Sequence, residues 1–361
     1  MKDPRIKKLA SLILDHSVSI RKGDKLLVEG SYISLPLIKE LYKQALIKEA
    51  HPYVSIKEDS LRELFFEHAK KEQLEYIHEY EWLYKPNFDA RIVILSETNT
   101  KIFSNIDPSK EKIARMARKK LTSKVRSIKR WNICIYPTLG YAQDAEMSLE
   151  KFEDFVFDSC YCGYNDPVAQ LKKDLEWQRE LRNKLQQGEN IRIVAKGTDI
   201  SMSVSQRLFC VEEGTVNLPT GEIFVGPVED SVNGEIKFSY PLIFGGRVID
   251  GIWLKFKDGK VIDYNTRKNK KAFTELLTTD EGAKFVGELG IGTNPFVTKF
   301  CNNLLLDEKI LGTIHLALGQ SYEETLGKNK SSIHIDMVCD MRQDGIIYLD
   351  EKPIQKNGKF I

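Results

Sequence analysis

The first half of the chain alternates segments of helical apolar spacing with short runs of β-branched and other apolar residues. The helical spacing predicts helices over residues 6–14, 35–47, 60–71, 71–80 and 108–128. The apolar runs between them predict strands over residues 25–29, 52–56, 89–95 and 131–136. Strands that alternate with helices are typical of a parallel sheet covered on both faces, so we expect an α/β fold here.

The pattern changes after a charged, helix-like segment over residues 168–187. Turn sequences such as Lys257-Asp-Gly-Lys260 then separate short strand-like runs. These runs cover residues 191–195, 201–204, 236–240, 251–256 and 260–264, and one helix is expected over residues 270–286. A chain of 361 residues exceeds the roughly 250–300 at which a single core stops growing. We therefore expect an N-terminal α/β domain over residues 1–187 and a β-rich α+β domain over residues 188–361.

Two strand-like runs near the C-terminus contain histidines in apolar surroundings. Ser331–Met337 places His334 and Asp336 two residues apart, on the same face of a strand, and Gly312–Gly319 carries His315. For one such histidine, a hydrogen bond to the backbone is the commoner explanation of its burial. Recurrence favours a metal ion, because imidazole and carboxylate are common ligands of zinc, manganese and cobalt.

Two glutamates occur next to glycines and beside apolar stretches. Glu222 follows Gly221, and Glu288 follows Gly287. Glycine permits tight turns, and functional groups often lie on loops at strand ends. We therefore expect both carboxylates on loops from which they reach a shared cation, whereas Glu308 is interpreted as a surface charge.

Five motifs follow one another in the second half of the chain: Asn217–Glu222, Glu229–Gly234, Glu288–Asn294, Gly312–Gly319 and Ile333–Asp336. In their order they resemble the aminopeptidase T family of metallo-aminopeptidases, and the resemblance extends over nearly the full length. It implies metal ligands at Glu222, Glu288, His315, His334 and Asp336. It also implies an active-site tyrosine at Tyr322, and a homodimer.

The implied ligand set is larger than one zinc ion needs, since catalytic zinc usually has three protein ligands. Five ligands suit two divalent ions, of zinc, cobalt or manganese, that share one carboxylate, for which Glu288 is our candidate. Tyr322 would donate a hydrogen bond to the tetrahedral oxyanion, and Glu229 or Asp230 would orient a ligand histidine. The expected reaction is release of N-terminal amino acids from peptides with a free N-terminus, with Glu288 and Tyr322 in catalytic roles.

Two alternatives remain open. One is an amidase or esterase with one metal ion that acts on non-peptide substrates, and the other is a non-catalytic metal-binding relative. Metal stoichiometry distinguishes the first alternative from the two-metal enzyme.

Composition excludes several other classes. The formal net charge of +2 gives no general attraction to nucleic acid or membranes. The basic segment over residues 115–130 is therefore interpreted as a solvated face, although its role stays open. No run approaches about 18 apolar residues, and the start lacks the apolar core of a signal peptide, so we expect a cytoplasmic protein. Six cysteines in so long a chain do not suggest a disulfide scaffold.

Overall fold

The computed structural model describes residues 3–126, 128–244 and 247–361. The chain divides into two compact units, of which unit 1 comprises Met1–Leu171 and Gly214–Pro219 and unit 2 comprises Lys172–Glu213 and Thr220–Ile361. The chain thus passes between the units three times. The boundary placed after residue 187 from the sequence stays a prediction.

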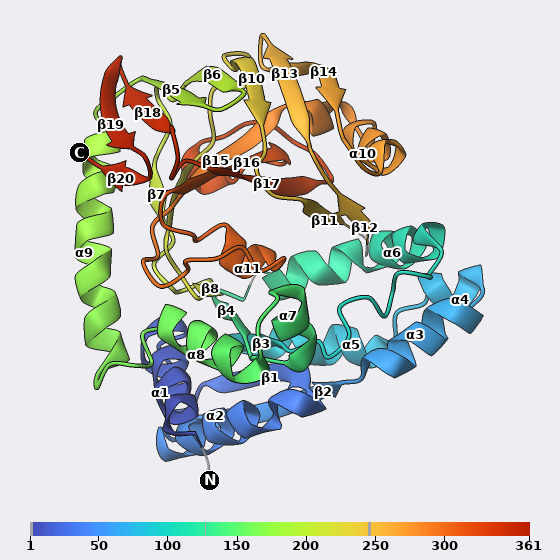
Figure 1. Cartoon of the computed structure of the whole chain (residues 1–361). Coiled ribbons are helices and arrows are strands. Elements are labelled where there is room, and N and C mark those ends of the chain that lie inside the picture. Colours follow the sequence, from blue (N-terminus) through green and yellow to red (C-terminus); the bar gives the residue numbers. More distant parts are fainter. Residues whose placement is uncertain (1–2, 127, 245–246) are drawn as a thin grey trace. The chain divides into compact units, whose positions relative to one another are not determined.

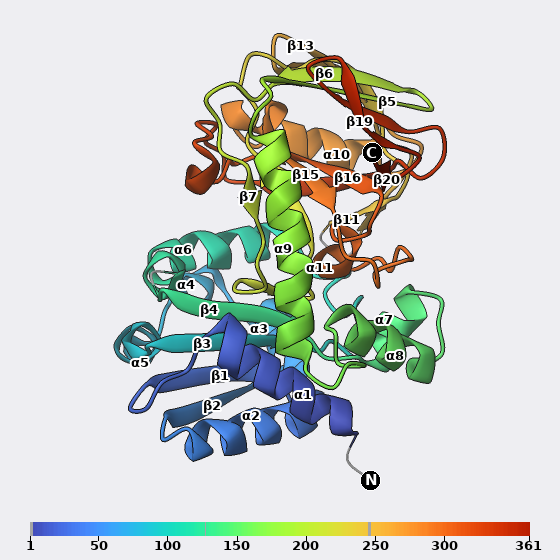
Figure 2. The ribbon, with the colours of Figure 1, turned by 90° about the vertical axis from the view of Figure 1, so that its left-hand side faces the viewer.

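Unit 1 contains a five-stranded sheet in which every neighbouring pair is parallel. The strand order is β2-β1-β3-β4-β8. The strands are β1 (Lys25–Ser31), β2 (His51–Lys57), β3 (Ala90–Leu95), β4 (Arg130–Ile135) and β8 (Asn217–Leu218). Figure 2 shows β1 to β4 side by side. The predicted parallel α/β fold of the first half is confirmed.

Helices precede, connect and follow β1 to β4. They are α1 (Pro4–Leu12), η1 (Ile13–Ser17), η2 (Tyr32–Ser34), α2 (Leu35–Ile47), α3 (Asp59–His68), α4 (Lys71–Glu75), α5 (Glu79–Tyr84), η3 (Lys85–Asn87), α6 (Pro108–Arg126), α7 (Leu139–Asp144) and α8 (Leu149–Ser159). The helix α9 (Pro167–Leu185) follows. Asp3 caps α1, since its carboxylate accepts a hydrogen bond from the backbone N–H of Arg5 at 2.8 Å. In the described part of the chain, no helix combines the length and the hydrophobicity that a membrane span requires.

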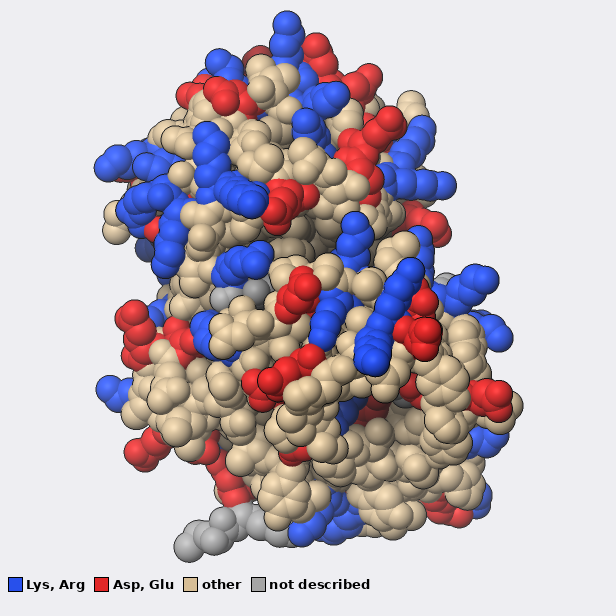
Figure 3. Space-filling view, turned by 90° about the vertical axis from the view of Figure 1, so that its right-hand side faces the viewer, with Lys and Arg blue, Asp and Glu red and all other residues tan. Residues whose placement is uncertain are grey.

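The helix predicted over residues 108–128 corresponds to α6, which ends at Arg126. Arg130, the last residue of the basic segment, lies in β4. Arg130 binds both carboxylate oxygens of Asp24, at 2.7 and 2.8 Å. Arg115, Lys119 and Lys120 are exposed, as a solvated helix face requires. Figure 3 shows acidic side chains interspersed among the basic ones on the face that it presents.

Unit 2 contains two antiparallel sheets and a short hairpin (Figure 1). The eight-stranded sheet has the order β14-β13-β10-β6-β5-β18-β19-β20, and the five-stranded sheet has the order β17-β16-β15-β9-β7. The eight strands are β5 (Asn190–Ala195), β6 (Thr198–Ser203), β10 (Asn233–Lys237), β13 (Trp253–Lys257), β14 (Lys260–Asn265), β18 (Ile346–Leu349), β19 (Lys352–Lys356) and β20 (Lys359–Phe360). The five are β7 (Cys210–Val211), β9 (Glu222–Val225), β15 (Val286–Gly292), β16 (Thr313–Gly319) and β17 (His334–Asp340), and the hairpin is β11 (Leu242–Phe244) and β12 (Arg247–Ile249). The helical elements are α10 (Lys270–Leu277), η4 (Glu281–Lys284), α11 (Leu304–Asp307) and η5 (Glu323–Thr325).

One hydrophobic core joins the two sheets of unit 2. Ile193 and Leu254 of the eight-stranded sheet belong to the same buried cluster as Leu289 and Leu316 of the five-stranded sheet. Since side chains alternate along a strand, Leu289 and Leu316 face this core, and their neighbours Glu288 and His315 face the opposite side of the sheet. The predicted β-rich second half is confirmed.

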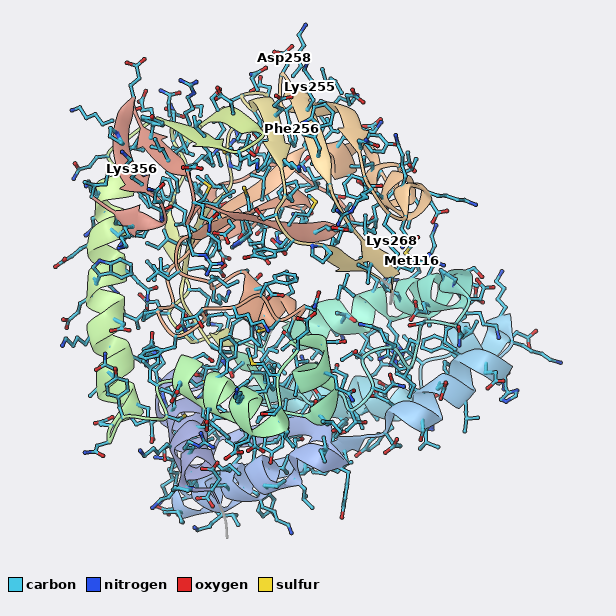
Figure 4. All side chains as sticks on the ribbon, in the orientation of Figure 1. Met116, Lys255, Phe256, Asp258, Lys268 and Lys356 are labelled. Carbon is cyan, nitrogen blue, oxygen red and sulfur yellow. The ribbon has the colours of Figure 1, made fainter. Side chains whose placement is uncertain are left out.

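Two local predictions in unit 2 have different outcomes. The turn at Asp258 and Gly259 is present, with φ values of 48° and 77° that suit a two-residue hairpin turn. Figure 4 shows Asp258 beyond Lys255 and Phe256 of β13. The helix predicted over residues 270–286 is wrong in length, because α10 ends at Leu277 and β15 begins at Val286.

Candidate metal centre

Four neighbouring strands carry the proposed ligands on one face of the five-stranded sheet. They are Glu222 at the start of β9, Glu288 in β15, His315 in β16, and His334 and Asp336 in β17. The register aligns Ala317 of β16 with Glu288 on one side and with Asp336 on the other. Residues spread over 115 positions of the chain therefore meet at one place because their strands are neighbours.

The two histidine rings lie on either side of the Glu288 carboxylate. Nε2 of His315 lies 3.1 Å from Oε1 of Glu288 and 3.3 Å from Oε2 of Glu222. Nε2 of His334 lies 3.6 Å from Oε2 of Glu288 and 3.4 Å from Oδ1 of Asp336. Each oxygen of Glu288 thus faces a different histidine, and the five side chains form two groups with one shared member.

Glycines in β15 make room for this arrangement. The pairing with β16 shifts between Val286 and Glu288, so Gly287 lies in a β-bulge, a feature that often redirects a side chain beside a functional site. A Cβ on Gly290 would lie 2.0 Å from Cε1 and Nε2 of His315. The expectation that Glu288 lies on a loop is wrong, because these glycines serve a strand rather than a turn.

The carboxylates are buried and incompletely paired. Glu288 is 3% exposed, and Glu222 and Asp336 are each 6% exposed. Among the described residues, Oε2 of Glu222, Oε2 of Glu288 and Oδ1 of Asp336 have no hydrogen-bond partner. Buried polar atoms normally have partners, and three such oxygens beside two imidazoles are a donor set that fits divalent metal ions. Ligand atoms of Glu222, Glu288 and His315 lie within 4.8 Å of one another, as do those of Glu288, His334 and Asp336.

The electrostatic field of the cluster favours cations. Burial alone would lower the pKa of His315, but Glu288 and Glu222 outweigh it and raise this pKa to about 9. Burial opposes protonation of His334 too, yet Asp336 and Glu288 raise the pKa of this imidazole to about 10. Asp336 in turn has a pKa lowered to about 2, because His334 and His315 outweigh its burial. A site that favours a proton this strongly also favours a metal cation at the same atoms.

His334 is oriented by the backbone. Its Nδ1–H donates to the carbonyl oxygen of Gln320 at 2.7 Å, so Nε2 is the ring nitrogen that faces the carboxylates and that would bind a metal ion once it loses its proton. The expectation that Glu229 or Asp230 orients a ligand histidine is wrong: Glu229 accepts from Arg207 and from the backbone N–H of Lys328, both at 2.6 Å, and Asp230 is exposed.

Tyr322 lies at the edge of the centre. Its ring is 4.9 Å from that of His334 and 5.8 Å from that of Phe224, centroid to centroid. Burial and the nearby carboxylates, Glu288 foremost, raise the pKa of its hydroxyl. The hydroxyl therefore stays protonated at neutral pH and is able to donate a hydrogen bond.

Two charged residues of the cluster were not expected from the sequence. Lys309 is completely buried, and its ammonium lies 2.6 Å from Oε1 of Glu222 and 2.8 Å from Oε1 of Glu308. The interpretation of Glu308 as a surface charge is wrong, since its side chain is only 12% exposed and groups with His315 and Asp336. The available signal was a charged Asp-Glu-Lys triplet between Leu304–Leu306 and Ile310–Leu311.

Comparison with known proteins identifies the class. A family model described as thermophilic metalloprotease (M29) matches residues 2–360. The chain belongs to this family of metalloproteases. The resemblance to the aminopeptidase T family and the expectation of a metal-dependent enzyme are thereby confirmed.

Relatives are similar over nearly their whole length. Aminopeptidase 2 from Geobacillus stearothermophilus is 25% identical, with 99% of this chain and 98% of the relative covered. Aminopeptidase T from Thermus thermophilus is 23% identical, with the same coverage. The solved structure of wild-type AmpT from Thermus thermophilus has a TM-score of 0.88 at 20% identity and covers 99% of both chains, so the fold is shared.

Proposed function

We propose that the protein is an aminopeptidase that uses two divalent metal ions to release N-terminal amino acids from peptides. The observation that carries the proposal is the position of Glu288, whose two carboxylate oxygens face His315 at 3.1 Å and His334 at 3.6 Å. A carboxylate between two imidazoles is suited to bridge two ions. Glu222 with His315 would complete one site, and His334 with Asp336 the other.

Two bound ions would supply a water nucleophile at neutral pH and polarise the scissile carbonyl. The chain itself holds the ligands in place on strands and buries the three carboxylates. The bond from Nδ1–H of His334 to Gln320 keeps Nε2 of this ring directed at them. Such rigid support keeps catalytic groups in their productive positions.

Tyr322 is our candidate for a group that acts on the transition state. Its position beside His334 and its raised pKa suit a hydroxyl that donates a hydrogen bond to the oxyanion of the tetrahedral intermediate. The hydroxyl is needed only when negative charge develops on the substrate. Its removal should therefore affect turnover rather than metal binding.

The substrate class is proposed from the relatives and from the expected metal chemistry. The similar proteins are named aminopeptidases. A divalent ion held by the cluster would leave coordination room for the neutral amine of a free N-terminus. We further expect a homodimer in the cytoplasm, and both stay predictions.

The test combines metal content with one pair of substrates. Purified protein is analysed for metal ions per chain, and cleavage of a free peptide is compared with cleavage of the same peptide carrying an N-acetyl group. We expect two ions per chain, cleavage of the free peptide and little cleavage of the blocked one.

Each departure from this result has a separate meaning. One ion per chain with esterase or amidase activity supports the one-metal alternative. Equal cleavage of both peptides contradicts recognition of the free amine, and a protein that binds metal without any hydrolysis supports the non-catalytic alternative.

A further inference from the structure

Lys309 has an unusual environment for a lysine. It is among the largest completely buried side chains of the described chain, and a buried ammonium is costly unless it is paired. Its two carboxylate partners, Glu222 and Glu308, lie at 2.6 and 2.8 Å. Glu222 is a proposed metal ligand, so Lys309 contacts the metal centre through this carboxylate without being a ligand itself.

The backbone around Lys309 is fixed by a network of hydrogen bonds. Asp307, 2% exposed, accepts from the backbone N–H groups of Cys301 at 2.6 Å and Asn303 at 2.8 Å. The carbonyl of Lys309 accepts from the backbone N–H of Asn294 at 2.9 Å. The lysine is therefore presented from a rigid turn that follows α11.

The same residue, Asn294, also fixes the turn that precedes Glu222. Its side-chain amide donates to the carbonyl of Thr220 at 2.7 Å. Gly221 has φ of +127°, and a Cβ at this position would lie 2.6 Å from Cβ of Asn294. The segments that carry Lys309 and Glu222 are thus both held by Asn294, through its backbone N–H and its side-chain amide.

The contact distinguishes the two oxygens of Glu222. Oε1 accepts the hydrogen bond from Lys309, whereas Oε2 has no hydrogen-bond partner and lies 3.3 Å from Nε2 of His315. One oxygen is thereby occupied by the ammonium, and the other is directed at the centre. A metal ion at this site would meet Glu222 through Oε2 alone.

The charges explain why Glu308 accompanies the lysine. Lys309 and Glu308 cancel one another, which leaves the three carboxylates of the proposed ligand set with a charge of −3. With both imidazoles neutral, two divalent ions and one hydroxide would balance that charge. A lysine without Glu308 would leave one positive charge in excess in a buried site, which is unfavourable.

We propose that Lys309 is a positioning residue of the metal centre, with Glu308 as its neutralising partner. Lys309 holds Glu222 so that only Oε2 reaches the metal, and it touches neither substrate nor reacting atoms. The inference rests on the proposed function, because it requires metal ions at Glu222.

The decisive variant is the double substitution Lys309→Met with Glu308→Gln. Lys309→Met alone leaves Glu308 as an unpaired carboxylate that would itself attract metal. The double variant removes both charges at similar volume, a change that folded proteins tolerate better than the loss of one partner. The matched control is Lys260→Met with Glu275→Gln, which removes one charge of each sign at exposed positions.

The measurement is titration of chelator-treated protein with zinc by calorimetry and with cobalt by visible absorption. We expect two sites in the wild type and in the control. In the double variant, the affinity of one site should fall by about 10–100-fold, as for other groups that orient a ligand, and the cobalt spectrum should change. Near-UV circular dichroism of the metal-free proteins establishes that the variants are folded.

Each result has one meaning for the proposal. Wild-type affinity and an unchanged cobalt spectrum in the folded double variant would overturn the positioning role. If the double variant does not fold, Lys309→Arg is measured in its place, because it keeps the charge but changes the geometry of the hydrogen-bond donor. An unaltered cobalt spectrum in Lys309→Arg would also overturn the positioning role. A wild-type protein that binds no metal refutes the proposed function itself, which is a distinguishable outcome.

Discussion

Replacing Gly290 with alanine should disturb the centre without changing any proposed ligand. Gly290 lies opposite His315 in the sheet, and a Cβ there would lie 2.0 Å from Cε1 and Nε2 of the ring. To restore a carbon–carbon contact of about 3.5 Å, the ring or the strand has to move by roughly 1.5 Å. Gly290 is not among the residues with positive φ, so the effect is steric.

The size of the effect follows from two costs. Inserting a methyl group into a packed site destabilises a protein by about 1–3 kcal/mol. For a unit of this size, each kcal/mol lowers the unfolding temperature by about 2–4 °C, so we expect a decrease of roughly 2–12 °C in the metal-free protein. Displacement of His315 should also weaken metal binding by about 10–100-fold, the usual effect of disturbing a ligand's orientation.

Calorimetric metal titration and thermal unfolding of the metal-free protein measure both effects. Gly163→Ala is the control, because the nearest atom to a Cβ there is a flexible carboxylate oxygen of Asp158 at 3.0 Å. If Gly290→Ala keeps both wild-type metal affinity and unfolding temperature, the close approach of the His315 ring to β15 is refuted.

Three further predictions concern the chemistry of the centre. Tyr322→Phe should lower kcat by about 10²–10³-fold while metal content stays at the wild-type value, and an unchanged kcat would assign the tyrosine to packing. Because the pKa values of His315 and His334 are raised to about 9 and about 10, both imidazoles carry protons at pH 7.5 in the metal-free protein, whereas a metal ion binds the neutral ring. Metal binding should therefore release at least two protons at pH 7.5, with a further contribution from Glu222, because burial raises the pKa of this carboxyl to about 8. Affinity should increase with pH until about 9–10. Calorimetry in buffers of different ionisation enthalpy measures the release, and none observed contradicts the proposed ligands. Removal of metal by a chelator should abolish hydrolysis and lower the unfolding temperature. The unfolding temperature falls because a ligand present at about 100 times its Kd stabilises the folded state by about 2.7 kcal/mol. Added zinc, cobalt or manganese should reverse both changes.

Local sequence patterns predicted those parts of the centre that depend on a single strand. The two-residue spacing of His334 and Asp336 placed both on one face, as β17 has them. The apolar run around His315 likewise indicated β16. Periodicity is a property of the segment itself, so it is readable without knowing its neighbours.

Features that depend on contacts between distant segments were not predictable in this way. Gly287 suggested a loop around Glu288, because glycine weakens strands, yet it lies in a bulge of β15. Gly290 of the same strand leaves space for a ring that is 25 positions away. Glu308 was interpreted as a surface charge because charged residues are rarely buried, and nothing local marked Lys309 as its buried partner. Their burial depends on Glu222, a partner 87 positions earlier in the chain, which no local pattern reveals.

The place of β17 in its sheet has a consequence for how the centre comes apart. β17 is an edge strand, paired within the five-stranded sheet only with β16, and it carries both His334 and Asp336. Edge strands open more readily than central ones, because fewer backbone hydrogen bonds have to break. A single local opening therefore removes two of the five groups at once, while Glu288 and His315 stay on central strands. Bound metal would hold His334 and Asp336 of β17 to Glu288 and His315 of the central strands. Exchange of the β17 amide protons with solvent should therefore be slower in the metal-bound protein than in the metal-free protein.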